Sequence, residues 1–184
     1  MATGFLVTNL TGKFQKLEEI VRKHSLNKLY VHVSVKNLEP NFKRNQWISS
    51  RITEIYAATS QLFPNLDVRI LLNGLKPKKC GIIKDDYKVD VFILPSGYST
   101  EDVLFFTKGN KNLPVVVLDN FEDFENQKSE IQKSTELKLY DNVVLGGTFD
   151  RLHAGHKILL TEALLRCRKK LTVGVTDTCM LQSK

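Results

Sequence analysis

Cysteine is scarce in this chain of 184 residues, which holds only Cys80, Cys167 and Cys179. An odd number with no paired spacing argues against a disulfide framework and against a zinc site, so we expect no bound metal. Scarce, unpaired cysteine is typical of a reducing compartment, and the sequence therefore predicts a cytoplasmic protein. The sequence also lacks any stretch of 18 uncharged apolar residues, which argues against a membrane-spanning helix.

Concentrated charge of one sign is missing too. The 27 basic and 20 acidic residues give a net charge of +7, but the excess is spread along the chain. A partner such as nucleic acid or a membrane surface is therefore not expected. The mild positive charge favours phosphorylated small molecules as ligands instead. The composition leaves the oligomeric state undefined.

Apolar, β-branched runs alternate with segments of helical periodicity. Several runs are almost continuously hydrophobic, as in parallel strands that are covered on both faces. The alternation predicts an α/β fold, Rossmann-like, with mostly parallel sheets and flanking helices. The expected strands are Leu29–Val35, Asp67–Leu72, Val89–Leu94, Pro114–Leu118, Asn142–Leu145 and Leu171–Val175. The expected helices are Asn45–Leu62 and Gly155–Lys169, with weaker patterns at Phe14–His24, Thr100–Thr107 and Asp123–Lys133.

Two polar stretches punctuate this pattern. Residues 73–88 contain Gly, Pro and several lysines and are typical of a long solvated loop. Residues 125–138 are charged and poor in large apolar side chains, which favours a boundary there. We therefore expect an N-terminal α/β domain of unassigned role over residues 1–138 and a second domain over residues 139–184.

The most informative segment follows the predicted strand near residue 145. It reads Gly146-Gly147-Thr148-Phe149-Asp150-Arg151-Leu152-His153-Ala154-Gly155-His156-Lys157. Glycines permit close approach of a ligand to the backbone, and a helix start presents unpaired N–H groups and the positive end of its dipole. Two imidazoles three residues apart can donate hydrogen bonds to phosphate oxygens, with Lys157 or Arg151 as a nearby cation. The segment therefore predicts a polyphosphate site at the carboxyl end of a parallel strand.

Simpler interpretations compete with this one. A pair of histidines at this spacing is usually structural when it stands alone, and two glycines after a strand are common in plain turns. The phosphate-binding pattern GxxxxGK[ST] and the dinucleotide pattern GxGxxG are both absent from the sequence. The whole string, placed between a strand and a helix start, favours a functional site over these simpler interpretations.

At seven fixed positions the string resembles the GTFDxxHxGH signature of the nucleotidylyltransferase superfamily. The run from Gly146 to Lys157 is similar to the phosphopantetheine adenylyltransferase domain of the animal bifunctional coenzyme A synthases, and so are the flanking segments Leu171–Asp177, Leu181–Lys184, Asp67–Leu72 and Leu29–Val33. The resemblance implies a reaction in which 4′-phosphopantetheine and ATP give dephospho-coenzyme A and pyrophosphate. It also implies ATP with Mg²⁺ as substrate, no bound prosthetic group, and a possible mitochondrial location beside the cytoplasmic one.

The resemblance assigns roles to individual positions. It makes His156 the residue that contacts the ATP phosphates and supports charge at the α-phosphorus, with His153 in a supporting position. Thr148 matches the residue that hydrogen-bonds the attacking phosphate, and Lys184 matches a lysine that binds the same phosphate. The expected nucleotide-binding residues are Gly147, Thr148, Phe149, His153, Gly155 and His156. Asp150 is expected to hold the loop through local backbone hydrogen bonds.

The resemblance covers only the beginning of the adenylyltransferase domain and includes no kinase motif. We therefore expect an incomplete nucleotidylyltransferase fold and little activity from the 184 residues alone, as in a truncated form. Two alternatives remain open. The chain is a nucleotidylyltransferase for another acceptor or donor, such as nicotinamide mononucleotide or a cytidylyl nucleotide, or it is a non-catalytic scaffold or regulatory module.

Overall fold

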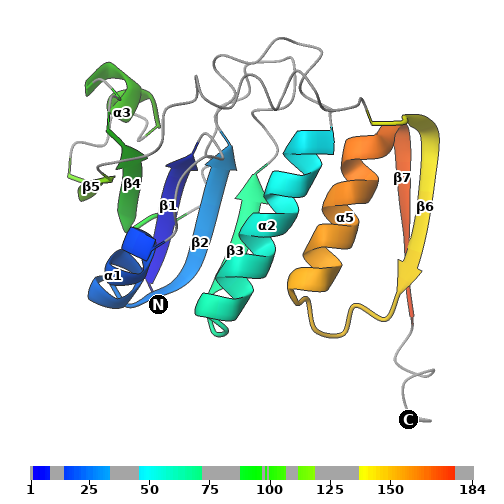
Figure 1. The fold of residues 1–184 in the computed structure, drawn as a ribbon, viewed down its shortest axis with the longest axis horizontal. Coiled ribbons are helices and arrows are strands. Elements are labelled where there is room, and N and C mark those ends of the chain that lie inside the picture. The colour runs from blue at the N-terminus through cyan, green and yellow to red at the C-terminus, as the bar shows by residue number, and fades with distance from the viewer. Residues whose placement is uncertain are drawn as a thin grey trace.

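The computed structural model describes residues 2–8, 15–33, 46–71, 88–96, 98, 100–106, 112–118 and 137–176. These residues form two parallel sheets with helices beside them, which confirms the predicted α/β class (Figure 1). The predicted helix 123–133, the lysine-rich loop, Lys184, Cys80 and Cys179 lie outside the described residues. Within the described residues, no helix is both long enough and apolar enough to span a membrane.

The larger sheet has five parallel strands in the order β3-β2-β1-β4-β5. This order is that of a doubly wound sheet, in which the chain proceeds in one direction from β1 and then returns to start β4 on the other side. The strands are β1 (Ala2–Thr8), β2 (Leu26–Val33), β3 (Asp67–Leu71), β4 (Val91–Pro95) and β5 (Val115–Leu118). The helices between them are α1 (Gln15–Lys23), α2 (Gln46–Leu62) and α3 (Thr100–Phe106).

Alternate side chains of these strands enter two different cores, because successive residues of a strand point to opposite faces. Leu6, Val31 and Ile93 pack with buried residues of α1 and α2. Phe5 and Phe92 occupy the other face, where their ring centroids are 5.0 Å apart. Both faces of the central strands are therefore buried, which explains their continuously hydrophobic sequences.

The central strand β1 is the element that the sequence pattern did not predict. Its run Phe5-Leu6-Val7 is short, and its first half contains Gly4. A Cβ atom at Gly4 would lie 2.7 Å from Cδ1 of Leu26, so the absence of a side chain there is what lets β2 pack closely. The glycine that weakens the strand signal is thus required by the packing.

The smaller sheet is a strand–helix–strand unit made of β6 (Tyr140–Gly147), α5 (Ala154–Arg166) and β7 (Cys167–Val175). β6 and β7 pair in parallel, with Gly147 opposite Val175. The helix is shorter than predicted, because Cys167 is the first strand residue and pairs with Tyr140. Leu164 is 42% exposed, whereas Leu165 is buried.

Helix α5 joins the two sheets, because it packs against α2 on one side and against β6 and β7 on the other (Figure 1). Leu165 belongs to the same hydrophobic cluster as the buried residues of α2 and the first sheet. Ser49 of α2 donates a hydrogen bond to Glu162 of α5. The start of α5, where the predicted site lies, is therefore held by contacts from the first sheet as well as the second. The division into domains at residues 138 and 139 stays a prediction.

A buried histidine in β2 makes the first sheet sensitive to acid. His32 is 4% exposed, and burial lowers its pKa from 6.5 to about 4. The unfolded chain therefore binds a proton between these pH values while the folded chain does not. Stability is unaffected above the unfolded pKa and falls as the pH drops towards 4, by about 3 kcal/mol in total. We expect urea unfolding to show this loss of stability between pH 7 and pH 4. In His32→Gln the loss of stability over the same pH range should be smaller by about 3 kcal/mol. Equal losses in both proteins would contradict the assignment.

Candidate functional site

The loop between β6 and α5 begins where the strand ends at Gly147. The carbonyl oxygen of Gly147 accepts a hydrogen bond from the backbone N–H of Thr176 at 3.1 Å, so the ends of β6 and β7 are tied together. The ring of Phe149 folds back over Gly147, where a Cβ atom would lie 3.0 Å from its Cε2. A side chain at position 147 would therefore displace the ring. Thr148, between these two residues, is half-buried at the carboxyl end of the sheet.

The aromatic ring of Phe149 is held by an uncommon backbone conformation. Phe149 has φ of 48°, in the left-handed region that costs a residue with a side chain about 1–2 kcal/mol. In this conformation its ring centroid lies 4.9 Å from that of His156. The next residue, Asp150, accepts a hydrogen bond from the N–H of Arg151 at 2.9 Å, as predicted for a residue that orders the loop. The turn is thus closed by its own side chains.

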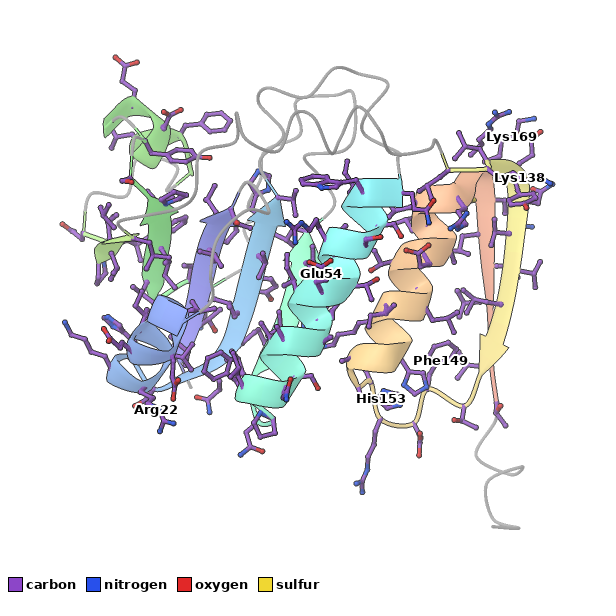
Figure 2. All side chains as sticks on the ribbon, viewed as in Figure 1. Arg22, Glu54, Lys138, Phe149, His153 and Lys169 are labelled. Atoms are coloured by element: carbon purple, nitrogen blue, oxygen red, sulfur yellow. The ribbon has the colours of Figure 1, made fainter. Side chains whose placement is uncertain are left out.

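The two histidines meet at the first turn of α5. Their ring centroids are 4.0 Å apart, and Figure 2 shows His153 and Phe149 beside each other below the helix start. His153 is the N-cap residue of α5, and its Nδ1 accepts a hydrogen bond from the N–H of Gly155 at 3.1 Å. His156 lies one turn later, with Nδ1 at 3.0 Å from the carbonyl oxygen of Arg151. The structure therefore brings both imidazoles and the helix start together.

These contacts give the two rings different hydrogen-bonding roles. Because Nδ1 of His153 accepts, its proton is on Nε2, which is a donor even in the neutral ring. Because Nδ1 of His156 faces a carbonyl oxygen, it carries the proton, and its Nε2 is an acceptor unless the ring is charged. A phosphate oxygen can therefore be bound by neutral His153, whereas binding by Nε2 of His156 requires the imidazolium form. Sequence reasoning treated the two as equivalent donors.

The ammonium of Lys157 contacts the first sheet. It donates to Oδ1 of Asp67 at 2.6 Å and to the carbonyl oxygen of Val68 at 2.7 Å. Burial acts to raise the pKa of Asp67, but the hydrogen bond and charge of Lys157, with Arg69 at 2.8 Å, outweigh it and hold that pKa below its usual value. Of the two cations predicted for the phosphate site, Arg151 is exposed beside the turn and Lys157 is engaged elsewhere.

A cleft of about 320 Å³ opens between the start of α5 and the first sheet. Its lining includes His153 and Lys157 from the start of α5, Asp67 of β3 and Tyr56 of α2. Sequence reasoning missed Asp67 and this cleft, because nothing in a strand's first residue shows that it will meet a lysine 90 positions later. Among the described residues, no group of three His, Cys, Asp or Glu side chains is placed to hold a metal ion.

The cap of α5 offers a direct test of this geometry. A Cβ atom at Gly155 would lie 3.0 Å from Cε1 of His153 and 3.2 Å from its Nδ1. Gly155→Ala is therefore expected to push the capping imidazole away and to lose about 0.5–2 kcal/mol of stability. Urea unfolding measures the loss, with Gly174→Ala as the control, because a Cβ there meets only ordinary contacts at 3.8 Å or more. Equal effects of the two substitutions would contradict the cap.

Comparison with known proteins agrees with the resemblance found in the sequence signature. No protein-family model matches the chain. The chain is 25% identical to the phosphopantetheine adenylyltransferase of Saccharomyces cerevisiae over 150 residues, which are 79% of this chain and 47% of that protein. A segment of 47 residues, 26% of this chain, is 49% identical to the phosphopantetheine adenylyltransferase of Thermococcus kodakarensis and covers 28% of it.

An uncharacterised protein of Schizosaccharomyces pombe is 25% identical over 171 residues, 88% of this chain and 53% of that protein. The chain thus matches about half the length of the two yeast relatives and less than a third of the Thermococcus protein. None of the three is named a bifunctional coenzyme A synthase, and that finer resemblance remains a proposal. The chain is therefore similar, at 25% identity over most of its length, to a protein named phosphopantetheine adenylyltransferase.

Proposed function

We propose that this chain takes part in coenzyme A biosynthesis as the nucleotide-binding part of a phosphopantetheine adenylyltransferase. In this reaction a phosphate oxygen of 4′-phosphopantetheine forms a bond to the α-phosphorus of ATP. The bond from that phosphorus to the bridging oxygen breaks, and pyrophosphate leaves with the electron pair. The observation that carries the proposal is the pair of imidazoles 4.0 Å apart at the N-terminus of α5, beside the carboxyl ends of two parallel strands.

The residues of the turn suit this reaction, which needs orientation and charge stabilisation rather than a covalent nucleophile. In the proposal, Nε2 of His153 and the free N–H groups of α5 bind the triphosphate, and charged His156 stabilises the α-phosphate as its negative charge grows. Gly147 and Gly155 leave room for the rings of Phe149 and His153, and Phe149 holds the His156 ring. Thr148 and Lys184 are assigned to the attacking phosphate, Lys184 lying outside the described residues.

Magnesium belongs to the substrate in this proposal. A turn that offers two imidazoles does not suit Mg²⁺ as a resident ion, because that ion prefers oxygen ligands. Mg²⁺ bound to ATP would neutralise part of the triphosphate charge. We also propose that the chain comes from a bifunctional coenzyme A synthase, on the strength of the segments that flank the signature. That origin would place the product, dephospho-coenzyme A, next to a kinase activity.

Calorimetric titration of the 184-residue chain with Mg²⁺–ATP, Mg²⁺–CTP and 4′-phosphopantetheine tests the proposal. We expect heat from ATP and from 4′-phosphopantetheine, and much weaker heat from CTP. Pyrophosphate release with nicotinamide mononucleotide in place of 4′-phosphopantetheine is the control for the acceptor. Preference for CTP, or pyrophosphate release with nicotinamide mononucleotide alone, would replace the proposal by another nucleotidylyltransferase. The absence of heat from every nucleotide would favour a scaffold or regulatory module.

A further inference from the structure

A charged side chain in the first turn of α5 contacts the first sheet. The Lys157 side chain is 18% exposed, and its ammonium has two acceptors, a carboxylate oxygen of Asp67 and the carbonyl oxygen of Val68. Lys157 is the residue after His156, and its own N–H donates to the carbonyl oxygen of His153 at 3.2 Å. The contact therefore attaches the segment that carries both imidazoles to the first residue of β3.

Two other contacts hold α5 further along its length. Glu162 accepts from Ser49 of α2, and Thr161 is hydrogen-bonded to the Tyr56 hydroxyl, which also accepts from the N–H of Ile70. These contacts position the middle of the helix, about one turn or more away from the histidines. Among the described residues, Asp67 and Val68 of the first sheet hydrogen-bond to the first turn itself, where Ala154 also packs against the hydrophobic cluster.

We propose that Asp67 is a positioning residue for the phosphate-binding turn. Its carboxylate, acting through Lys157, holds the start of α5 so that the imidazoles of His153 and His156 keep the arrangement a triphosphate needs. The inference rests on the proposed function, since it concerns the same turn. It gives the first sheet a part in the reaction, although none of its described residues belongs to the signature. A preorganised donor pair binds more tightly because less order has to be created on binding.

A purely electrostatic role of Asp67 would have the opposite effect on ATP binding. If Asp67 only kept Lys157 away from the ligand, its removal would free a cation and tighten the binding of ATP. The Val68 carbonyl, however, remains as an acceptor for the ammonium at 2.7 Å. We therefore expect that Asp67→Asn loosens the turn and weakens Mg²⁺–ATP binding by about fivefold, the scale of one partly exposed charge pair.

The experiment uses the 184-residue chain with Asp67→Asn, Asp67→Glu and Lys157→Met. Titration with Mg²⁺–ATP gives the affinity, and the nitrogen and carbon-bound proton resonances of the imidazoles give the geometry without any nucleotide. We expect Asp67→Asn and Lys157→Met to weaken binding and to shift the resonances of both histidines. Asp67→Glu keeps the carboxylate and is expected to restore most of the affinity. Circular dichroism verifies that each variant is folded at the temperature used.

Two controls isolate the contact. Arg69→Gln removes the other partner of Asp67, and Asp141→Asn removes a surface pair with Lys169 of similar length, 2.7 Å. Both are expected to leave ATP affinity and the histidine resonances unchanged. Tighter ATP binding by Asp67→Asn, or unchanged histidine resonances in that variant, would overturn the proposal. If the wild-type chain binds no ATP, the proposed function fails, while the resonances still decide whether Asp67 positions the turn.

Discussion

If the proposed function holds, replacement of His156 by alanine is expected to lower kcat/KM for the proposed adenylyl transfer from ATP to 4′-phosphopantetheine by about 100- to 1,000-fold. This is the effect of removing one preorganised donor from a site where charge develops. His156 suits that role because its Nδ1 is fixed on the carbonyl oxygen of Arg151 and its ring lies against Phe149. Pyrophosphate release, measured on a form of the protein that turns over both substrates, gives the rate.

The control for this substitution is His24→Ala, which removes an imidazole from the end of the α1 segment, outside the turn. We expect that variant to retain the wild-type rate. The His156→Ala protein is expected to keep its fold, since the side chain is half-buried in the first turn of α5 and belongs to neither hydrophobic cluster. A loss smaller than about threefold in kcat/KM would remove His156 from the mechanism, because a donor to the developing charge contributes far more.

The largest expected effect on stability comes from Phe92→Ala in β4. Phe92 is completely buried, and its ring packs against Phe5 of the central strand. Truncation of such a side chain to alanine leaves a cavity and is expected to cost about 3–5 kcal/mol. That loss is a large share of the total stability of a domain of this size. Urea unfolding followed by circular dichroism measures it.

A control substitution and a second spectroscopic signal, tryptophan fluorescence, make this prediction more specific. Val144→Ala in β6 removes an aliphatic side chain that is 75% exposed, and we expect it to change stability by less than about 0.5 kcal/mol. Trp47, the one tryptophan of the sequence, is buried in α2, so its fluorescence reports the packing of the first sheet. Fluorescence and circular dichroism should shift together in Phe92→Ala. A loss below 1 kcal/mol would mean that the Phe5–Phe92 face is not a close-packed core.

The predicted strands and the main helices agree with the structure to within a few residues wherever they are described. Strands buried on both faces produce apolar runs that are recognisable without any alignment, as in β4. The failures have identifiable causes. β1 was missed because close packing against Leu26 requires a glycine inside a short strand. The last turn predicted for α5 was wrong, because pairing of Cys167 with Tyr140 outweighs the helix propensity of the basic residues that follow.

The same distinction between local and long-range contacts applies to the candidate site. Its turn was predictable, since the contacts that close it join residues at most seven positions apart, such as His156 with Arg151 and with Phe149. The string Gly147–His156 therefore encodes its own geometry. The different proton positions of the two imidazoles follow from which backbone groups they meet, and a spacing pattern does not contain that information.

The amino-acid sequence alone accounts for the parallel α/β class and for the local turn that brings glycine backbone, a helix start and two histidines together. Periodicity and short-range hydrogen bonds are properties of neighbouring residues, so they are readable in order along the chain. Only the tertiary structure made β1 the central strand, ended α5 at Arg166 and placed Lys157 on Asp67. Those outcomes depend on which distant surfaces pack against each other, and the hydrophobic burial that drives such packing has no preferred partner until the chain has folded.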